Sequence, residues 1–168
     1  MKKSLKIFLI ILVTLCFSSC QISQYEVQGL TIKDKTKSAC YDKSVEILRC
    51  FDEKDVEGLK SFFCQYSQES PNISKEIEDA FDFYKGKSVS FKFAYNGGVA
   101  GSWRDGKAID EHIEPELEDI TTDLGQVYRI YYLEYITYVK DEKCVGITYM
   151  LIFDENTDEK IQIGKYID

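Results

Sequence analysis

The hydrophobic pattern of this chain changes its period once, at Gly86, and no other feature restricts the fold as strongly. Between Ser38 and Lys85, apolar residues recur every three or four positions, which is the spacing of amphipathic helices. Beyond Gly86, apolar residues alternate with smaller or polar ones over 88–95, which is the period of half-buried strands. Helices followed by an antiparallel meander predict an α+β domain rather than alternating βαβ units.

The part of the chain before Gly86 predicts three helices. Asp55 is expected to cap the second helix, whose apolar positions continue to residue 63. Ser70 and Pro71 predict the start of the third helix, as a capping hydroxyl followed by proline at the first helical position. Gly86 is expected to end it. The first helix carries one inward-facing stripe, which consists of Cys40, Ser44, Ile47, Leu48 and Phe51.

Turn residues divide the rest of the chain into strands. The triplets at 96–98 (Asn-Gly-Gly) and 104–106 (Arg-Asp-Gly) are expected to form turns. Residues 109–123 are acidic and contain Pro115, which favours a loop with one short edge strand. The predicted strands cover 88–95, 99–103, 116–121, 127–139, 144–153 and a last segment that holds Ile161 and Ile163.

The long strand over 127–139 has large residues on both faces, so it is expected to be covered on both sides. Because Arg129 and Thr137 make the odd-numbered face more polar, the even-numbered face is predicted to meet the helices. Glu134 on that face would then lie among tyrosines and isoleucines. Burial would raise its pKa and allow it to act as an acid, a base or a ligand anchor. The alternatives are a solvated Glu134, if the faces are reversed, or a structural glutamate that is satisfied by tyrosines.

The candidate pocket residues combine this carboxylate with aromatic side chains. Tyrosine hydroxyls suit polar ligands, and an indole at the end of a hairpin can stack on a ligand. Aromatic residues are also common in strands for packing alone, so core packing is the alternative for each of them. The predicted pocket consists of Trp103, Tyr128, Tyr132, Glu134 and Tyr149.

The N-terminus has the composition of a secretory signal. Lys2, Lys3 and Lys6 precede an apolar run that is too short to span a membrane, and the small residues at 18–19 precede Cys20. This block resembles a bacterial lipoprotein signal, which implies lipidation of Cys20 and a cell-membrane anchor on the extracytoplasmic face. An ordinary signal peptide that is cut near Ser19 is the alternative. The predicted organisation is a signal peptide over 1–19, the lipidated cysteine and a flexible tether over 20–37, and a domain over 38–168.

Cleavage before Cys20 would make an acidic chain more acidic. It removes three lysines and no acids, so that 18 basic and 29 acidic residues remain, with a net charge of −11. Such a surface repels nucleic acid and anionic lipid, so neither is an expected partner. Membrane attachment is expected to come through the N-terminal lipid.

The cysteines and the histidine give little support to a metal site or to catalysis. Cys40 and Cys50 would be about 15 Å apart on one helix, too far for a disulfide, whereas Cys64 could meet either of them. The alternative is that these thiols and Cys144 are buried and reduced. No two of Cys40, Cys50, Cys64 and Cys144 are closely spaced and His112 is the sole histidine, so no metal, no other cofactor and no cysteine nucleophile are predicted.

Two stretches of the chain resemble known families. The segment 53–63 (Glu-Lys-Asp-Val-Glu-Gly-Leu-Lys-Ser-Phe-Phe) is similar to the second-helix entry of the nuclear transport factor 2-like superfamily. The chain from 41 to 163 also resembles a bacterial lipoprotein family described as domain of unknown function 5104. The resemblance implies a cone of three N-terminal helices packed on a curved antiparallel sheet, with any site in the mouth of the cone, and no catalytic residues to transfer. It is carried by Phe83-Tyr84-Lys85-Gly86, Arg104-Asp105-Gly106-Lys107, Thr122-Asp123-Leu124-Gly125, Tyr128-Arg129-Ile130-Tyr131-Tyr132 and Val145-Gly146-Ile147.

Three functions follow as expectations. The first is a lipid-anchored extracytoplasmic lipoprotein that is not an enzyme and binds a small ligand or a protein partner. The second is a cone-fold enzyme of isomerase or hydrolase type, with Glu134 as general base. The third is a structural surface protein that forms a homodimer through the strand over 127–139.

Overall fold

The computed structural model describes residues 37–95 and 99–167. The predicted signal peptide, Cys20 and the predicted tether up to residue 36 lie outside these residues, as does the predicted turn at 96–98. Lys37, at the end of the predicted tether, is already helical. No helix in the described part of the chain has the length and hydropathy needed to cross a membrane.

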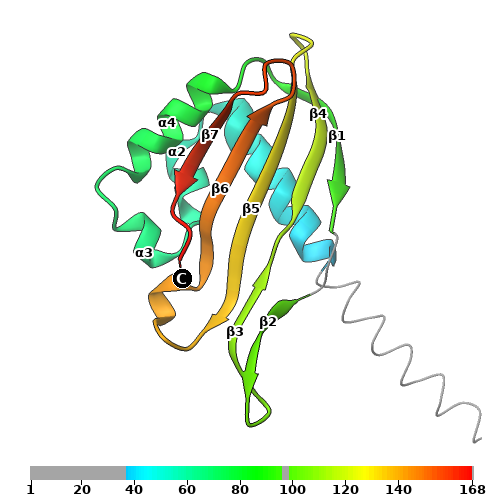
Figure 1. The fold of residues 1–168 in the computed structure, drawn as a ribbon. Helices are drawn as coiled ribbons and strands as arrows, with labels where there is room; N and C mark the ends of the chain where they lie inside the picture. Colours follow the sequence, from blue (N-terminus) through cyan, green and yellow to red (C-terminus); the bar gives the residue numbers. More distant parts are fainter. Residues whose placement is uncertain (1–36, 96–98, 168) are drawn as a thin grey trace, which may run out of the picture. The chain divides into compact units, whose positions relative to one another are not determined.

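The compact unit Cys40–Asp168 has the predicted α+β architecture. Its helices lie on one face of a curved, open antiparallel sheet (Figure 1). A first helix over residues 37–53 is followed by α2 (Val56–Ser61), α3 (Gln65–Gln68) and α4 (Ile73–Phe83). The strands are β1 (Ser88–Ala94), β2 (Ala100–Arg104), β3 (Lys107–Ile113), β4 (Glu116–Thr122), β5 (Val127–Tyr138), β6 (Gly146–Asp154) and β7 (Lys160–Gly164), with a 3-10 turn η1 (Glu142–Cys144) before β6.

The helices agree with the predicted pattern except around α3 and at the end of α4, which stops at Phe83, three residues before the predicted stop at Gly86. The Asp55 side chain caps α2 by accepting a hydrogen bond of 2.8 Å from the Gly58 amide. The short helix α3 was not predicted, because it depends on a distant partner. Phe63 forms a parallel bridge with Ile147, which ends α2 and lets the chain start a new helical turn. Helix α4 begins at Ile73, two residues after the predicted start at Pro71, because residues 70–72 belong to the turn between α3 and α4.

The acidic stretch 109–123 is where the sequence prediction was wrong. It was expected to be a loop with one edge strand, but it holds most of β3 and all of β4, which run one after the other along the same edge of β5. Strand β4 is not at an edge, because β1 pairs with its other side. Pro115 lies between β3 and β4, where its missing N–H removes no hydrogen bond from either strand. Its carbonyl accepts a hydrogen bond from the Tyr132 amide.

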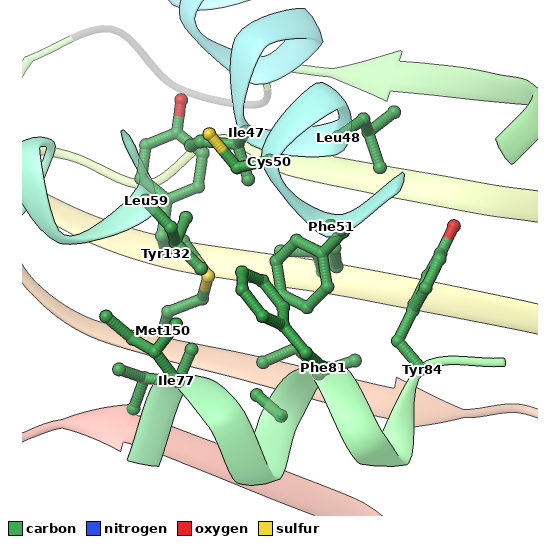
Figure 2. Close-up of a cluster of buried hydrophobic side chains, with 14 of the residues drawn as sticks. Ile47, Leu48, Cys50, Phe51, Leu59, Ile77, Phe81, Tyr84, Tyr132 and Met150 are labelled. Carbon is green, nitrogen blue, oxygen red and sulfur yellow. The ribbon is translucent and has the colours of Figure 1, made fainter. Parts of the chain in front are cut away.

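One hydrophobic core joins the helices to the sheet. Phe51 of the first helix lies at its centre, with ring centroids 5.2 Å from those of both Phe81 and Tyr84 (Figure 2). Tyr132 and Met150 come from the facing strands and have no exposed surface. Side chains from all layers therefore fill this part of the interior, at a density that tolerates little change in volume.

The even-numbered face of β5 meets the helices from Tyr128 to Tyr132, as predicted. The alternation breaks at Ile136, which is an extra residue in β5 between the pairs Glu111–Thr137 and His112–Tyr135. Ile136 is therefore exposed, and the prediction that it faces the helices was wrong.

The same bulge places Tyr138 on the opposite face of the sheet from the one predicted. There it joins a second cluster, which contains Leu133, Tyr135 and Cys144 and is covered in part by Ile167. The Tyr135 hydroxyl donates a hydrogen bond of 3.1 Å to the Ile167 carbonyl. At this end of β5, the chain thus covers the second apolar face with its own C-terminal segment.

Candidate functional site

A cluster of polar side chains lies where the first helix crosses β5, and we call it the Glu134 cluster. It consists of Cys40, Lys43 and Ser44 from the helix and Tyr132 and Glu134 from the strand. Lys43 Nζ forms an ion pair with Glu134 Oε1, and the Ser44 hydroxyl is 3.2 Å from the Tyr132 hydroxyl. The Glu134 side chain is 14% exposed, so the alternative of a solvated Glu134 on a reversed strand does not hold.

The second carboxylate oxygen of Glu134 is the chemically unusual atom of this cluster. Oε2 is buried and has no hydrogen-bond partner among the residues that the structure describes. An unsatisfied buried oxygen of this kind destabilises a protein by about 1–3 kcal/mol, so a ligand that donates a hydrogen bond to it gains binding energy.

Helix periodicity explains how the cluster is assembled. Cys40 and Ser44 are four residues apart on the buried stripe of the first helix, one turn before Leu48. Lys43 borders this stripe and its side chain is 29% exposed, and its ammonium pairs with Glu134 of the facing strand. The cluster therefore combines one charged pair, two hydroxyls and one thiol.

Burial raises the pKa of the Cys40 thiol to about 11, and the nearby charge of Glu134 acts in the same direction, while Lys43 opposes it. The thiol is therefore protonated at neutral pH. Burial also raises the pKa of the Tyr132 hydroxyl, and its hydrogen bond with Ser44 opposes this shift. Both groups are neutral hydrogen-bonding groups at physiological pH, and neither is a nucleophile under these conditions.

The raised pKa of Cys40 predicts a loss of stability in alkali. Between pH 9 and 11 the unfolded thiol loses its proton while the folded thiol keeps it, so the free energy of unfolding falls as the pH rises through this window. We expect Cys40→Ala to reduce this fall by about 1–2 kcal/mol, less than the full shift would give because solvent screening weakens the effect of the nearby charges.

Urea unfolding of both proteins at several pH values from about 8 to 11 measures this difference. The two pH profiles are compared with each other, because burial raises the pKa values of Cys50, Cys144 and the buried tyrosines Tyr84 and Tyr132 in the same way in both proteins. Parallel profiles for wild type and Cys40→Ala would contradict the assignment.

The structure separates the five residues of the predicted pocket. Tyr132 and Glu134 come together in the Glu134 cluster. Tyr128 lies in the core at the end of α4, where its hydroxyl accepts a hydrogen bond of 3.0 Å from the Lys85 amide. Tyr149 faces the other side of the sheet, with its ring centroid 6.2 Å from that of Tyr131. Trp103 is 62% exposed on the β2–β3 hairpin, which projects from the sheet (Figure 1).

Lys43, Ser44 and Cys40 were not predicted as partners of Glu134. The polar residues Cys40 and Ser44 on an otherwise apolar stripe were a usable signal, because buried polar groups need partners. Lys43 carried no such signal, since it lies 91 residues from Glu134 and the pair exists only because the helix packs on β5.

His112 lies on the opposite face of the sheet from Glu134. It pairs with Tyr135 across the β3–β5 ladder, and the two ring centroids are 5.5 Å apart. Its Nε2 is 3.7 Å from Glu114, while Nδ1 is buried without a hydrogen-bond partner within residues 37–95 and 99–167. His112 therefore does not take part in the Glu134 cluster.

The four described cysteines form neither a disulfide nor a group that could hold a metal ion. Cys40, Cys50, Cys64 and Cys144 are all free and buried. Within the described ranges, no three His, Cys, Asp or Glu residues are grouped so that they could hold a metal ion.

Comparison with known proteins places the chain in a family. No match is found among curated proteins. A family model described as a domain of unknown function, DUF5104, matches residues 46–155, which is well over half of the chain. The match extends from the first helix to the turn after β6 and includes Tyr132 and Glu134. The chain therefore belongs to the family of domain of unknown function DUF5104.

Proposed function

We propose that this protein is a lipid-anchored lipoprotein on the extracytoplasmic face of a bacterial membrane, and that its domain binds a small polar ligand at the Glu134 cluster. The apolar run that ends before Cys20 supports the anchor. Helices on a curved, open sheet support a nuclear transport factor 2-like cone, with the cluster between the first helix and the sheet.

The unpartnered Oε2 of Glu134 carries the proposed binding function. The ligand supplies an N–H or O–H donor to this oxygen, while Lys43 holds the other oxygen in place. Because the cluster is part of a packed helix–strand contact, its geometry is set before the ligand arrives, which lowers the entropy lost on binding.

Catalysis by Glu134 as general base is the second candidate, and the same free oxygen favours it. The surroundings favour binding instead. Cys40 is protonated, Lys43 is engaged by the carboxylate, and His112 lies on the other face of the sheet. The Tyr132 hydroxyl, the other group of the cluster that could take part in acid–base catalysis with Glu134, is engaged by Ser44.

Replacing Glu134 with glutamine tests this function. Full-length protein is purified from membranes in mild detergent and examined by native mass spectrometry for a bound small molecule. We expect wild type to carry an added mass, and Glu134→Gln to lose at least about 90% of it, because a tenfold loss of affinity corresponds to about 1.4 kcal/mol.

Glu57→Gln is the matched control, since Glu57 is exposed on α2 and away from the cluster. It is expected to keep the added mass. An unliganded wild type, or equal occupancy in Glu134→Gln and wild type, would contradict binding at this cluster. Catalysis would be supported instead if Glu134→Gln retained the ligand but no longer converted it.

A further inference from the structure

A hollow of about 310 Å³ lies between α3, the start of α4 and the end of β7, on a different part of the domain from the Glu134 cluster. We call it the α3–β7 hollow. Tyr66 and Pro71 supply apolar surface, Glu76 and Lys165 supply opposite charges, and Ser67 and Gly164 form part of its wall. Its volume is at the lower end of the range for small-molecule sites, about 300–1,000 Å³.

The walls of the hollow are held by bonds between distant parts of the chain. Glu76 Oε2 accepts a hydrogen bond of 2.9 Å from the Gly164 amide, which joins α4 to β7. The buried Ser67 hydroxyl donates to the Thr148 carbonyl at 3.3 Å, which joins α3 to β6. Ligand-contacting groups on such elements are positioned before a ligand enters.

Gly164 also shows how closely β7 approaches its neighbour at this wall. Its φ is +74°, and a Cβ at this position would lie 2.3 Å from the Thr148 carbonyl oxygen. A side chain here would have to displace backbone, so glycine is required for the hollow to keep its shape.

The charged residues of the hollow differ in whether they already have a partner within the protein. Glu69, which also lines it, is already bound to Lys143 at 3.0 Å and to Gln65 at 2.8 Å. Glu76 uses one oxygen for the Gly164 amide, which leaves the other for a ligand. Lys165 forms no ion pair with any residue that the structure describes. One anion and one cation therefore remain for a ligand, at neighbouring elements.

The hollow also has an apolar surface beside its charged residues. The side chain of Tyr66 is 52% exposed on α3 and, with Pro71, borders the same space. Exposed aromatic rings beside charged groups can cover the apolar part of a small ligand.

We propose that the α3–β7 hollow binds a free zwitterionic α-amino acid with an apolar side chain. Its ammonium group pairs with Glu76, its carboxylate pairs with Lys165, and its side chain packs on Tyr66 and Pro71. This arrangement neutralises both unpaired charges at once, whereas a ligand with only one charge leaves the other uncompensated.

Isothermal titration of the full-length protein with three related probes tests the proposal. L-Phenylalanine carries both charges, its methyl ester carries only the ammonium, and N-acetyl-L-phenylalanine carries only the carboxylate. We expect the amino acid to bind at least about tenfold more tightly than either derivative. Absence of heat at amino-acid concentrations up to about 10 mM, or equal binding of all three probes, would overturn it.

Two variants assign the charges separately. Glu76→Gln keeps an acceptor for the Gly164 amide and is expected to abolish the preference for the amino acid over N-acetyl-L-phenylalanine. Lys165→Gln is expected to abolish its preference over the methyl ester. Glu57→Gln and Lys107→Gln, on α2 and the β2–β3 hairpin, are matched controls that should bind as wild type does. The proposed contacts would be contradicted if Glu76→Gln still preferred the amino acid over N-acetyl-L-phenylalanine and Lys165→Gln still preferred it over the methyl ester.

Glu134→Gln separates this inference from the proposed function. It is expected to leave phenylalanine binding unchanged, because Glu134 does not line the α3–β7 hollow. Loss of phenylalanine binding in Glu134→Gln, with binding unchanged in Glu76→Gln and Lys165→Gln, would place the amino-acid site at the Glu134 cluster instead.

Discussion

Replacing Cys20 with alanine is expected to abolish fatty-acid incorporation and to release the protein from the membrane fraction. The proposed anchor depends on acyl chains at this thiol, each buried CH₂ contributing about 0.8 kcal/mol to membrane binding. The net charge of −11 that is expected after cleavage before Cys20 would not replace them, since anionic lipid repels an acidic protein. Metabolic labelling with an alkynyl fatty acid, followed by membrane fractionation, measures both effects.

Cys16→Ala is the matched control for this experiment, because Cys16 belongs to the predicted signal peptide and leaves with it. It is expected to retain the label and the membrane location. An unlabelled wild type, or a label that persists in Cys20→Ala, would exclude lipidation at Cys20 and remove the proposed anchor.

Phe51→Ala is expected to lower the free energy of unfolding by about 3–5 kcal/mol. Phe51 has no exposed surface and belongs to the core that joins the helices to the sheet, in ring contact with Phe81 and Tyr84 (Figure 2). Its removal leaves a cavity that these packed neighbours cannot fill. Since domains are stable by only about 5–15 kcal/mol, this loss would be a large part of the total. Urea unfolding followed by circular dichroism measures it.

Trp103→Ala is the control for Phe51→Ala, because it removes a large aromatic side chain from the surface instead of the core. Trp103 is also aromatic and large, but it is 62% exposed on the β2–β3 hairpin, so the expected change stays within about 0.5 kcal/mol. A loss below about 1 kcal/mol for Phe51→Ala, or a similar loss for both variants, would contradict the described core.

Elements with local signals were predictable. The Asp55 carboxylate caps α2 through the Gly58 amide three residues later, so the signal and its partner are neighbours in sequence. Asp105 and Gly106 both have positive φ, as a tight hairpin turn requires, and these residue types tolerate that conformation. In such cases the sequence contains the whole interaction.

Elements that depend on a distant partner were not predictable. Strand β3 is acidic and would not stand out as a strand, but its backbone pairs with both β2 and β5. Helix α3 exists because residues 62–64 bind the backbone of Ile147, more than 80 positions later. Backbone hydrogen bonds of this kind carry no side-chain signature.

The strand residues of the candidate site could be predicted from the sequence, but its helix residues could not. The two-residue period of β5 placed Tyr132 and Glu134 on the helix-facing side. Lys43 became their neighbour only through packing, and the bulge at Ile136 reversed the alternation beyond Tyr135. One added residue in one strand changes which face every later side chain occupies, and hydrophobic periodicity alone does not reveal where it is inserted.

The sequence by itself determined the α+β class, the order of most helices and strands, and the turn at 104–106, because these depend on periodicity and on interactions between near neighbours. Only the tertiary structure decided that β3 and β4 share one edge of β5, that Lys43 holds Glu134, and that Glu76 and Lys165 border one hollow. These contacts join residues far apart in the chain, and the packing of complete elements brings them together.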